Sequence, residues 1–491
     1  MGTRKDAEGY TFNSEGTTTT TPTIQLTHGQ QSAFNEFLQF IQASDCKAYI
    51  LRGYAGTGKT TLVKTFIGEL QKQNREFVLL ASTGRAAKIM ANATGCQTST
   101  IHGLIYKFDD LNQDMEKYTE EQAAADERGQ LYLNFDLCPV MLDEERFYLV
   151  DESSMISDEK DENENQAVFG SGCLLTDLFE YDPKGKFVFI GDACQLPPIS
   201  QRFSPALSAT YLENKFGFSV LETELTEIVR QSEGNDIVQS AQQMRRLYLH
   251  PQPWKWAKFP MKGYRNIHVL SSTAELYREY LKTIKSEGYK EATLLSFSNK
   301  QCSTVTDIIR PSLGVEGKKL SVGDLLLVTQ NNYISSLMNG DQVTVKSIHA
   351  EEHRAGLTFL HVEVQEMFTG KVYSQLLVED ILYCSQTNLT QYQQKALYID
   401  FYKRMKEKNI RQKDNAFKMA MMQDPYLNAI RAVYGYSLTC HKAQGGEWKK
   451  VFLDIPRCLP LQEKPYVYQW VYTAMTRASA DLYVVNDFYL M

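Results

Sequence analysis

The sequence predicts an α/β protein with parallel sheets, and two observations support this fold class. Short apolar runs such as residues 147–150 and 187–190 are bounded by polar residues, with helical stretches between several of them. Such runs are typical of strands buried on both faces of a parallel sheet. Polar groups suited to chemistry directly follow several runs, at the carboxyl ends where open α/β sheets bind ligands.

Composition and charge narrow the class of protein. The chain has 491 residues, 43% of them hydrophobic and 23% charged, which fits a soluble protein of roughly two to four domains. No stretch approaches the roughly 18 apolar residues of a membrane span, and no apolar run resembles a secretory signal. The nine cysteines are scattered without a C-x-x-C pair, which argues against disulfides or zinc and favours the cytoplasm. The net charge of −7 argues weakly against a nucleic-acid partner, although a basic groove can lie on an acidic body.

The first part of the chain alternates strands and helices after a polar segment. Residues 1–23 include a run of threonines and predict a disordered tail. Thr27 is expected to cap a helix over residues 30–41. The elements expected next are a strand over 48–51, a helix over 59–72, a strand over 77–81, a helix from Arg85, and strands over 147–150 and 187–190.

Two segments interrupt the alternation. Residues 106–145 are acidic and predict a small inserted subdomain, while residues 321–384 alternate as strands do and predict a small barrel. The Asn339-Gly340 pair is a turn signal inside the latter. The predicted division is a tail at 1–23, a first α/β domain at 24–105 and 146–262 with an insertion at 106–145, and a second α/β domain at 263–320 and 432–491 with a barrel and helical insertion at 321–431.

A complete phosphate-binding loop, Gly53-x4-Gly58-Lys59-Thr60, lies between an expected strand and an expected helix. Glycines let backbone N–H groups point inward around phosphate oxygens. Lys59 would reach the β- and γ-phosphates, and Thr60 would ligate Mg²⁺. The predicted nucleotide-binding residues of this segment are Gly53, Gly56, Thr57, Gly58, Lys59, Thr60 and Thr61.

Two further groups point to hydrolysis of the triphosphate. Asp151 and Glu152 end an apolar strand, where Asp151 can hold Mg²⁺ and Glu152 can activate water. Gln195 follows the next strand, and its amide can sense the γ-phosphate or orient the water.

These segments, in this order, resemble the superfamily 1 helicases, most closely the branch of phage Dda and bacterial RecD. The resemblance covers roughly residues 26–485. The segments that carry it, besides the glycine loop, are 26–30 (LTHGQ), 81–87 (ASTGRAA), 98–102 (TSTIH), 151–155 (DESSM), 191–198 (GDACQLPP), 225–231 (LTEIVRQ), 437–445 (SLTCHKAQG) and 471–478 (VYTAMTRA).

The resemblance implies two RecA-like domains with ATP in the cleft between them. Gln30 would then read adenine, and Glu447 would bond the ribose. Arg230 and Arg477 look like arginine fingers, because a planar, permanent cation suits the charge on a transferring phosphoryl group. Gly446 stands where many relatives carry a larger apolar residue.

The resemblance also implies contacts to single-stranded nucleic acid across both domains. Hydroxyl, amide and imidazole groups bond phosphates without reading sequence. Residues 106–145 occupy the place of a strand-splitting pin, with a solvated loop as the alternative, and the barrel would help to enclose the strand. The implied strand contacts are Thr83, Thr100, His102, Asn299, Thr439 and His441, and the candidate pin-tip residues are Phe108, Leu131, Tyr132 and Phe135.

The implied function is an ATP- and Mg²⁺-dependent DNA helicase that moves 5′ to 3′ on single-stranded DNA. It would unwind duplexes at junctions in replication, recombination or repair, with proteins of those processes as partners. The direction rests on the resemblance alone. The alternatives are the motor subunit of a nuclease or repair complex, an RNA helicase, and a P-loop regulatory ATPase. The strand-contact motifs on both domains argue against the last of these.

Overall fold

The computed structural model describes residues 25–111, 115, 132–142, 144–160, 167–229, 235–315, 317–384 and 386–491. The predicted tail at 1–23, the pin candidate Leu131 and the arginine Arg230 lie outside these residues. Among the described residues, no helix combines the length and the apolar character needed to cross a membrane.

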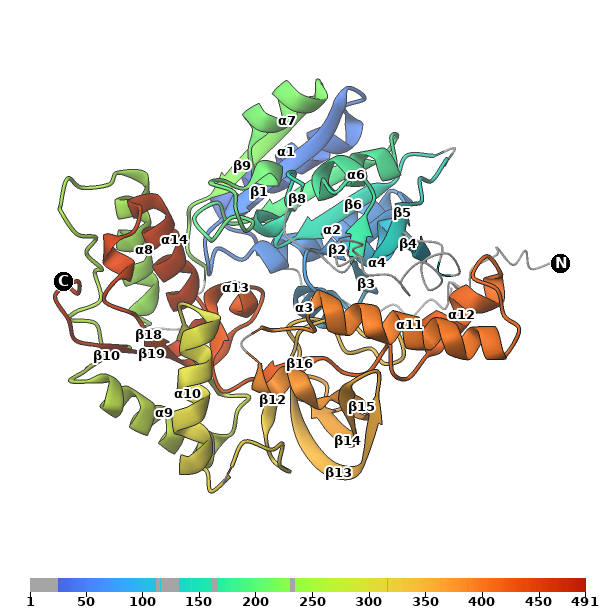
Figure 1. Cartoon of the computed structure of the whole chain (residues 1–491). Helices are drawn as coiled ribbons and strands as arrows, with labels where there is room; N and C mark the ends of the chain where they lie inside the picture. Colours follow the sequence, from blue (N-terminus) through green and yellow to red (C-terminus); the bar gives the residue numbers. More distant parts are fainter. Residues whose placement is uncertain are drawn as a thin grey trace.

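The first parallel sheet has six strands in the order β3-β2-β6-β8-β1-β9 (Figure 1). All of its neighbouring strands are parallel, so the predicted fold class is confirmed. Its strands are β1 Cys46–Gly53, β2 Phe77–Ala81, β3 Thr98–Thr100, β6 Phe147–Asp151, β8 Lys186–Gly191 and β9 Ser219–Leu225. The accompanying helices are α1 His28–Gln42, α2 Lys59–Lys72, α3 Gly84–Thr94, α4 Ile101–Ile105, α6 Leu174–Tyr181 and α7 Ala209–Phe216. Helix α8 Ile237–Leu249 follows the first sheet in the chain but packs in the core of the second parallel sheet.

The second parallel sheet has five strands in the order β10-β19-β18-β11-β17. Its strands are β10 Ile267–Leu270, β11 Ala292–Ser296, β17 Leu438–Thr439, β18 Trp448–Asp454 and β19 Ala478–Val485. Its helices are α9 Thr273–Glu287, α10 Asn299–Ser312, α13 Cys440–Ala443 and α14 Lys464–Met475. A large apolar cluster joins its core to Tyr54, Cys194 and Leu196 of the first sheet's loops.

The first insertion contains a three-stranded sheet in the order β4-β5-β7. Strands β4 Tyr106–Leu111 and β5 Leu133–Leu137 pair antiparallel, and β7 Ala167–Phe169 joins from beyond the predicted segment. Phe108 and Phe135 lie 5.7 Å apart between ring centroids inside this sheet, and Phe135 is 6% exposed. Their prediction as pin-tip residues is therefore wrong, because both rings serve the packing of the sheet.

The second insertion is an antiparallel sheet in the order β15-β14-β13-β12-β16. Its outer strands approach each other through Ile430, whose N donates to Leu376 O at 2.7 Å and whose O accepts from Val378 N at 3.0 Å. The Asn339-Gly340 turn lies between β12 and β13, as predicted. The elements are β12 Leu325–Val328, β13 Gln342–Arg354, β14 Leu357–Glu366, β15 Val372–Val378, β16 Ala432–Tyr434, α11 Gln391–Glu407 and α12 Asn415–Gln423.

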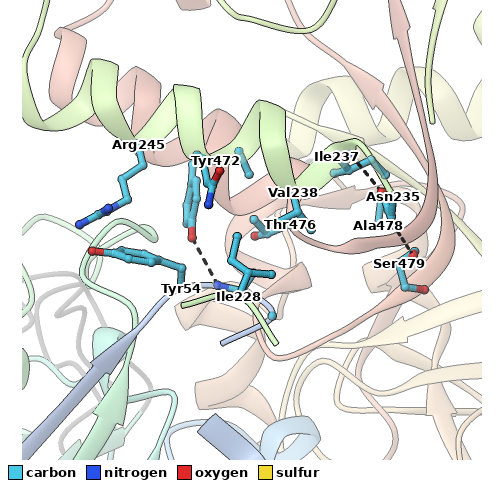
Figure 2. Close-up of a pocket in the computed structure, with 14 residues that line it drawn as sticks. Tyr54, Ile228, Asn235, Ile237, Val238, Arg245, Tyr472, Thr476, Ala478 and Ser479 are labelled. Atoms are coloured by element: carbon cyan, nitrogen blue, oxygen red, sulfur yellow. Dashed lines mark hydrogen bonds between the residues drawn. The ribbon is translucent and has the colours of Figure 1, made fainter. Parts of the chain in front are cut away.

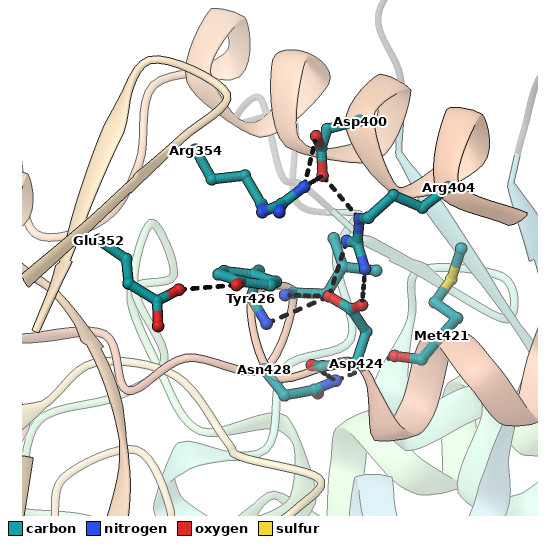
Figure 3. A network of polar contacts seen from close by, with 9 residues as sticks. Glu352, Arg354, Asp400, Arg404, Met421, Asp424, Tyr426 and Asn428 are labelled. Atoms are coloured by element: carbon teal, nitrogen blue, oxygen red, sulfur yellow. Dashed lines mark hydrogen bonds and ion pairs between the residues drawn. The ribbon is translucent and has the colours of Figure 1, made fainter. Parts of the chain in front are cut away.

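Helices α11 and α12 run from this inserted sheet to the first insertion, below β4 and β5 in Figure 1. An ionic network fixes them (Figure 3). Arg404 on α11 donates a hydrogen bond to Asp400 at 2.9 Å and donates to both carboxylate oxygens of Asp424. Arg354, at the end of β13, bonds Asp400 at 3.1 Å. On the other side, Lys418 of α12 pairs with Asp109 of β4 at 3.0 Å.

Candidate functional site

The glycine loop joins the end of β1 to the start of α2. Gly56 and Gly58 have φ values of +83° and +78°, a region that side-chain-bearing residues rarely enter. A Cβ on Gly53 would lie 2.7 Å from Thr57 Oγ1, so the loop also needs glycine for space. Lys59 Nζ donates to Gly53 O at 2.6 Å and to Tyr54 O at 3.1 Å. The ammonium thus lies in the loop, where phosphate oxygens can replace these carbonyl groups.

Gln30 braces the loop from the outside. Its Nε2 donates to Thr57 O at 3.1 Å, and its side chain completes a capping box with Thr27 at the start of α1. Thr60 is exposed in the first turn of α2, next to Thr61. The structure thus brings Gln30 next to the glycine loop, so that the residues predicted to bind the nucleotide around this loop lie together.

Two carboxylates, those of Asp151 and Asp192, lie near Lys59 of the loop. Asp151 ends β6 and accepts the Glu152 N–H at 2.9 Å. Burial raises its pKa to about 6, the Glu152 charge adds to the rise, and Lys59 opposes it. Glu152 has φ +51°, a backbone strain that is typical of functional sites in non-glycine residues. Asp192 follows β8, and its burial likewise raises its pKa against the effect of Lys59.

Asp192 is a residue to which the sequence reasoning gave no role. Tyr472 on α14 donates its O–H to Asp192 Oδ2 at 2.7 Å and accepts from Ala55 N of the glycine loop at 3.5 Å. One side chain of the second sheet's layer therefore touches both the loop and the buried carboxylate. The available signal was the position of Asp192, a carboxylate directly after a buried strand.

Gln195 is buried with a free acceptor. Its side chain is 4% exposed, and its Oε1 has no hydrogen-bond partner within the described residues. Its backbone O accepts from Gln469 Nε2 of α14 at 3.1 Å. A buried amide oxygen without a partner is costly, which suits a group that meets a water or a ligand at this site.

A pocket lies between the glycine loop and the helices α8 and α14 (Figure 2). Tyr54, Ala55 and Gly56 line one side, and Arg245 and Tyr472 line the other. The Arg245 guanidinium lies 3.5 Å from the centre of the Tyr54 ring. The loop therefore faces groups from both sides of an interdomain cleft.

Arg477 is 6% exposed, and its guanidinium is hydrogen-bonded to residues of the second sheet's own layer. Its Nε donates to Thr473 O at 3.1 Å, its Nη1 to Gly446 O at 3.2 Å and its Nη2 to Thr476 Oγ1 at 3.3 Å. The structure thus places this predicted finger at the cleft's border without bringing it to the loop. Arg230 lies outside the described residues, but the preceding Val229 donates its N–H to Gly56 O at 3.0 Å. Glu447, the predicted ribose ligand, is exposed.

The residues predicted to contact single-stranded nucleic acid lie at the starts of helices that directly follow neighbouring β-strands. Thr83 and Thr100 cap α3 and α4, behind the paired strands β2 and β3. Asn299 begins α10, and Thr439 holds the N-cap position of α13 without a side-chain capping bond; these helices follow the paired strands β11 and β17. A Cβ on Gly445 would lie 3.5 Å from Thr83 Oγ1, so the two groups of residues meet at this point.

The two histidines among these residues are neutral at physiological pH. Burial lowers the pKa of His102 to about 4, and burial also lowers the pKa of His441. The His102 ring packs on Phe169 with 5.2 Å between centroids. A neutral imidazole can still donate one hydrogen bond to a phosphate.

Two family models match separate parts of this chain. Residues 25–247 match the family model of an AAA domain, and residues 434–485 match that of the UvrD-like helicase C-terminal domain. Over 322 residues the chain is 24% identical to the ATP-dependent DNA helicase dda of Enterobacteria phage T4, which covers 65% of this chain and 64% of that protein. Over 438 residues it is 22% identical to the ATP-dependent RecD2 DNA helicase of Deinococcus radiodurans, covering 89% of this chain and 46% of that protein.

The chain therefore spans less than two thirds of the length of these two relatives. Among solved structures, the Pif1 helicase from Bacteroides in complex with ADP-AlF3 and ssDNA gives a TM-score of 0.45 at 16% identity, with 95% of this chain and 93% of that chain covered. The first family model spans all six strands of the first sheet, and the second spans β17, β18 and β19 of the second sheet. These matches bear out the resemblance of the chain to the superfamily 1 helicases of the Dda and RecD2 type.

Proposed function

We propose that this chain is an ATP-dependent DNA helicase that translocates 5′ to 3′ on single-stranded DNA and unwinds duplexes at junctions. The observation that supports this best is Tyr472, through which the second sheet's layer contacts both the glycine loop and Asp192. A nucleotide in such a cleft touches both sheets, so its hydrolysis can change their relative position. The ATP dependence and the DNA substrate named for Dda and RecD2 support the same function.

In this proposal the first sheet holds the nucleotide. The loop from Gly53 to Thr61 surrounds the phosphates, and Lys59 contacts the β- and γ-phosphates. The donors present fit Mg²⁺, because the Thr60 hydroxyl and the Asp151 carboxylate are hard oxygen ligands. When bound, Mg²⁺ neutralises charge on the phosphates. Glu152 takes the proton of the attacking water.

Gln195, which follows β8 of the first sheet and has a free Oε1, orients the attacking water. The second sheet's layer completes the site. Arg477 leaves its backbone acceptors and stabilises the charge that develops on the phosphoryl group, together with Arg230. Gln30 and Glu447 contact the base and the ribose. Closure of the cleft thus completes the catalytic set, and product release opens it.

The strand crosses the helix starts of both sheets. The helix amides and capping hydroxyls at these positions suit phosphate oxygens and carry no base information. The proposed domains are the two α/β units and the two insertions of the sequence analysis, with unchanged boundaries. The strand contacts are Thr83, Thr100 and His102 from the first sheet, and Asn299, Thr439 and His441 from the second.

The site is tested with Lys59→Ala, which should abolish ATP turnover while far-UV circular dichroism stays that of the native fold. Lys64→Ala, on the same helix outside the loop, is the matched control and should turn over ATP normally. Turnover that survives in Lys59→Ala would refute the assigned site.

The substrate and direction are tested by strand displacement on duplexes with a 5′ or a 3′ tail, made as DNA and as RNA. We expect displacement only on DNA with a 5′ tail, and only with hydrolysable ATP. Preference for a 3′ tail would refute the direction, and preference for RNA would refute the substrate. ATP turnover that does not respond to any strand would refute the helicase function and favour a regulatory ATPase.

A further inference from the structure

The β12–β13 loop, residues 329–341, extends from the second insertion and touches two elements outside it. At one end it contacts the start of α3, where a Cβ on Gly84 would lie 2.2 Å from Met338 Sδ. At the other end the Tyr333 ring faces the Phe135 ring of β5, with 6.4 Å between centroids and 19° between the ring planes. The loop therefore spans the distance from the first sheet's helix α3 to the first insertion.

Both ends of the β12–β13 loop lie next to residues proposed to contact the strand. Phe135 stacks on Phe169 with 4.7 Å between centroids, and Phe169 packs on His102 with 5.2 Å. At the other end, Gly84 directly follows Thr83 in the chain. Because Thr83 and His102 are two of the proposed strand contacts of the first sheet, the loop runs beside the proposed path of the strand.

Tyr333 presents an open aromatic surface beside this path. Its side chain is 45% exposed. Burial nevertheless raises the pKa of its hydroxyl to about 12, so the protein surrounds the ring without covering it. An aromatic ring in such a place can stack on a nucleobase, which is a common way to bind single-stranded nucleic acid.

The residue before Tyr333 fixes the backbone around it. Asn332 Oδ1 accepts the Ile334 N–H at 3.0 Å and the Ser335 N–H at 2.9 Å. Asn332 Nδ2 donates to Asn428 O at 2.6 Å, which ties the loop to the segment before β16. A ring that is already held in place loses little freedom when a base binds, so little of the stacking energy is offset by ordering the loop.

The β12–β13 loop is neutral although the protein is acidic. Residues 329–340 contain no Asp, Glu, Lys or Arg, and the chain has a net charge of −7. Burial raises the pKa of Tyr398 to about 12, the charge of Arg431 opposes this rise, and Tyr333 adds to it. Arg431 and Tyr333 thus both lie near Tyr398. A phosphate backbone beside Tyr333 meets no repelling carboxylate from residues 329–340, and a buried cation lies close by.

We propose that Tyr333 is a base-stacking residue for the single strand, an inference that rests on the proposed function. The strand passes between the β12–β13 loop and the first sheet, with phosphates at Thr83, Thr100 and His102 and one base on the open surface of Tyr333. Since every base has a π-face, this contact favours no sequence, as a motor that steps along any strand requires. The second insertion thereby binds the strand directly.

The test measures the affinity of the full chain for labelled oligo-dT and for an abasic strand of the same length, by fluorescence anisotropy. Tyr333→Ala should bind oligo-dT roughly 5- to 150-fold more weakly than the wild-type chain, the contribution of one stacked base. On the abasic strand the two proteins should bind alike, because there is no base to stack. Tyr333→Phe keeps the ring and should retain the wild-type affinity for both strands.

The salt dependence of oligo-dT binding is a second readout. Stacking releases no counterions, so the slope of log affinity against log salt should stay that of the wild type in Tyr333→Ala, even though the affinity falls. Tyr392→Ala, which removes an 80% exposed tyrosine on α11, is the matched control and should change neither the affinity nor the slope.

Three results would overturn the stacking role while leaving the proposed function intact. One is a wild-type affinity for oligo-dT in Tyr333→Ala. Another is an equal loss on oligo-dT and on the abasic strand, which marks a ring that only packs on Phe135. The third is a loss in Tyr333→Phe as large as that in Tyr333→Ala, which assigns the contact to the hydroxyl. A wild-type chain that binds neither strand would overturn the proposed function, and this inference with it.

Discussion

Replacing Gly84 with alanine tests the contact between the β12–β13 turn and the start of α3. A Cβ on Gly84 would lie 2.2 Å from Met338 Sδ and 2.5 Å from Met338 Cβ, so the turn must move. Overpacking of this kind costs about 1–3 kcal/mol. Alanine gains at most about 1 kcal/mol over glycine in a helix, and we expect less at the first helical position. Gly84→Ala should therefore lower the free energy of unfolding by about 1–2 kcal/mol.

Gly68 is the matched control, because it lies inside α2 and a Cβ there would meet nothing within 4 Å. Gly68→Ala should raise the free energy of unfolding by about 0.5–1 kcal/mol. Both variants are compared by urea denaturation followed by circular dichroism. Adding Met338→Gly to Gly84→Ala should recover part of the loss, because glycine removes both the Sδ and the Cβ that a Cβ on residue 84 would meet. Equal stabilisation by both alanines would refute the packing of this turn on α3.

Three further outcomes are expected. Arg477→Ala should reduce maximal ATP turnover far more than ATP affinity, measured by steady-state kinetics and nucleotide binding; equal losses would contradict a finger role. The pKa of His102 is about 4 in the folded protein, below its ordinary 6.5, so the unfolded chain binds its proton more tightly. The stability that His102 contributes above pH 6.5 should thus be lost as pH falls towards 4, by up to about 3 kcal/mol. Urea titrations across this range should be flatter for His102→Phe, and an unchanged pH profile would contradict this assignment. Arg404→Met should lower the urea midpoint of unfolding, because it leaves the largely buried Asp424 carboxylate without its cationic partner. The expected loss in the free energy of unfolding is about 3 kcal/mol. Arg404→Lys should restore little of it, because lysine cannot make the bidentate contact.

Features set by contiguous residues were predictable from the sequence. The helix expected over residues 59–72 matches α2, and the strand expected over 147–150 matches β6 within one residue. The glycine loop was recognisable because its φ values of +83° and +78° require glycine at Gly56 and Gly58. In each case the chemistry depends on neighbours along the chain, so a pattern of residue types is sufficient.

Contacts between distant side chains were not predictable. The sequence shows that Trp448 is an aromatic and Arg85 a cation, but not that the Arg85 guanidinium stacks on the Trp448 ring, with 4.2 Å from Cζ to the ring centre. Phe135 illustrates the reverse error, since an aromatic in an acidic insertion suggests an exposed tip, yet it is 6% exposed. The hydrogen bond of 3.2 Å from Arg477 Nη1 to Gly446 O joins residues that are 31 positions apart in the chain, so no local pattern indicates it.

The segment 192–196 follows a strand of the first sheet, but its hydrogen bonds connect it to the second sheet's layer. Gln469 donates to one of its carbonyls at 3.1 Å, Thr473 accepts one of its amides at 2.8 Å, and Tyr472 donates to its carboxylate at 2.7 Å. These three residues share one face of α14, and buried hydrogen bonds are costly to break. The segment and α14 should therefore move together. The contact from Tyr472 to the glycine loop is longer, at 3.5 Å, so cleft motion should occur between the loop and this segment. In the proposed function, the Gln195 amide would then approach the triphosphate from the same side as Arg477, and both groups would depend on the same closure.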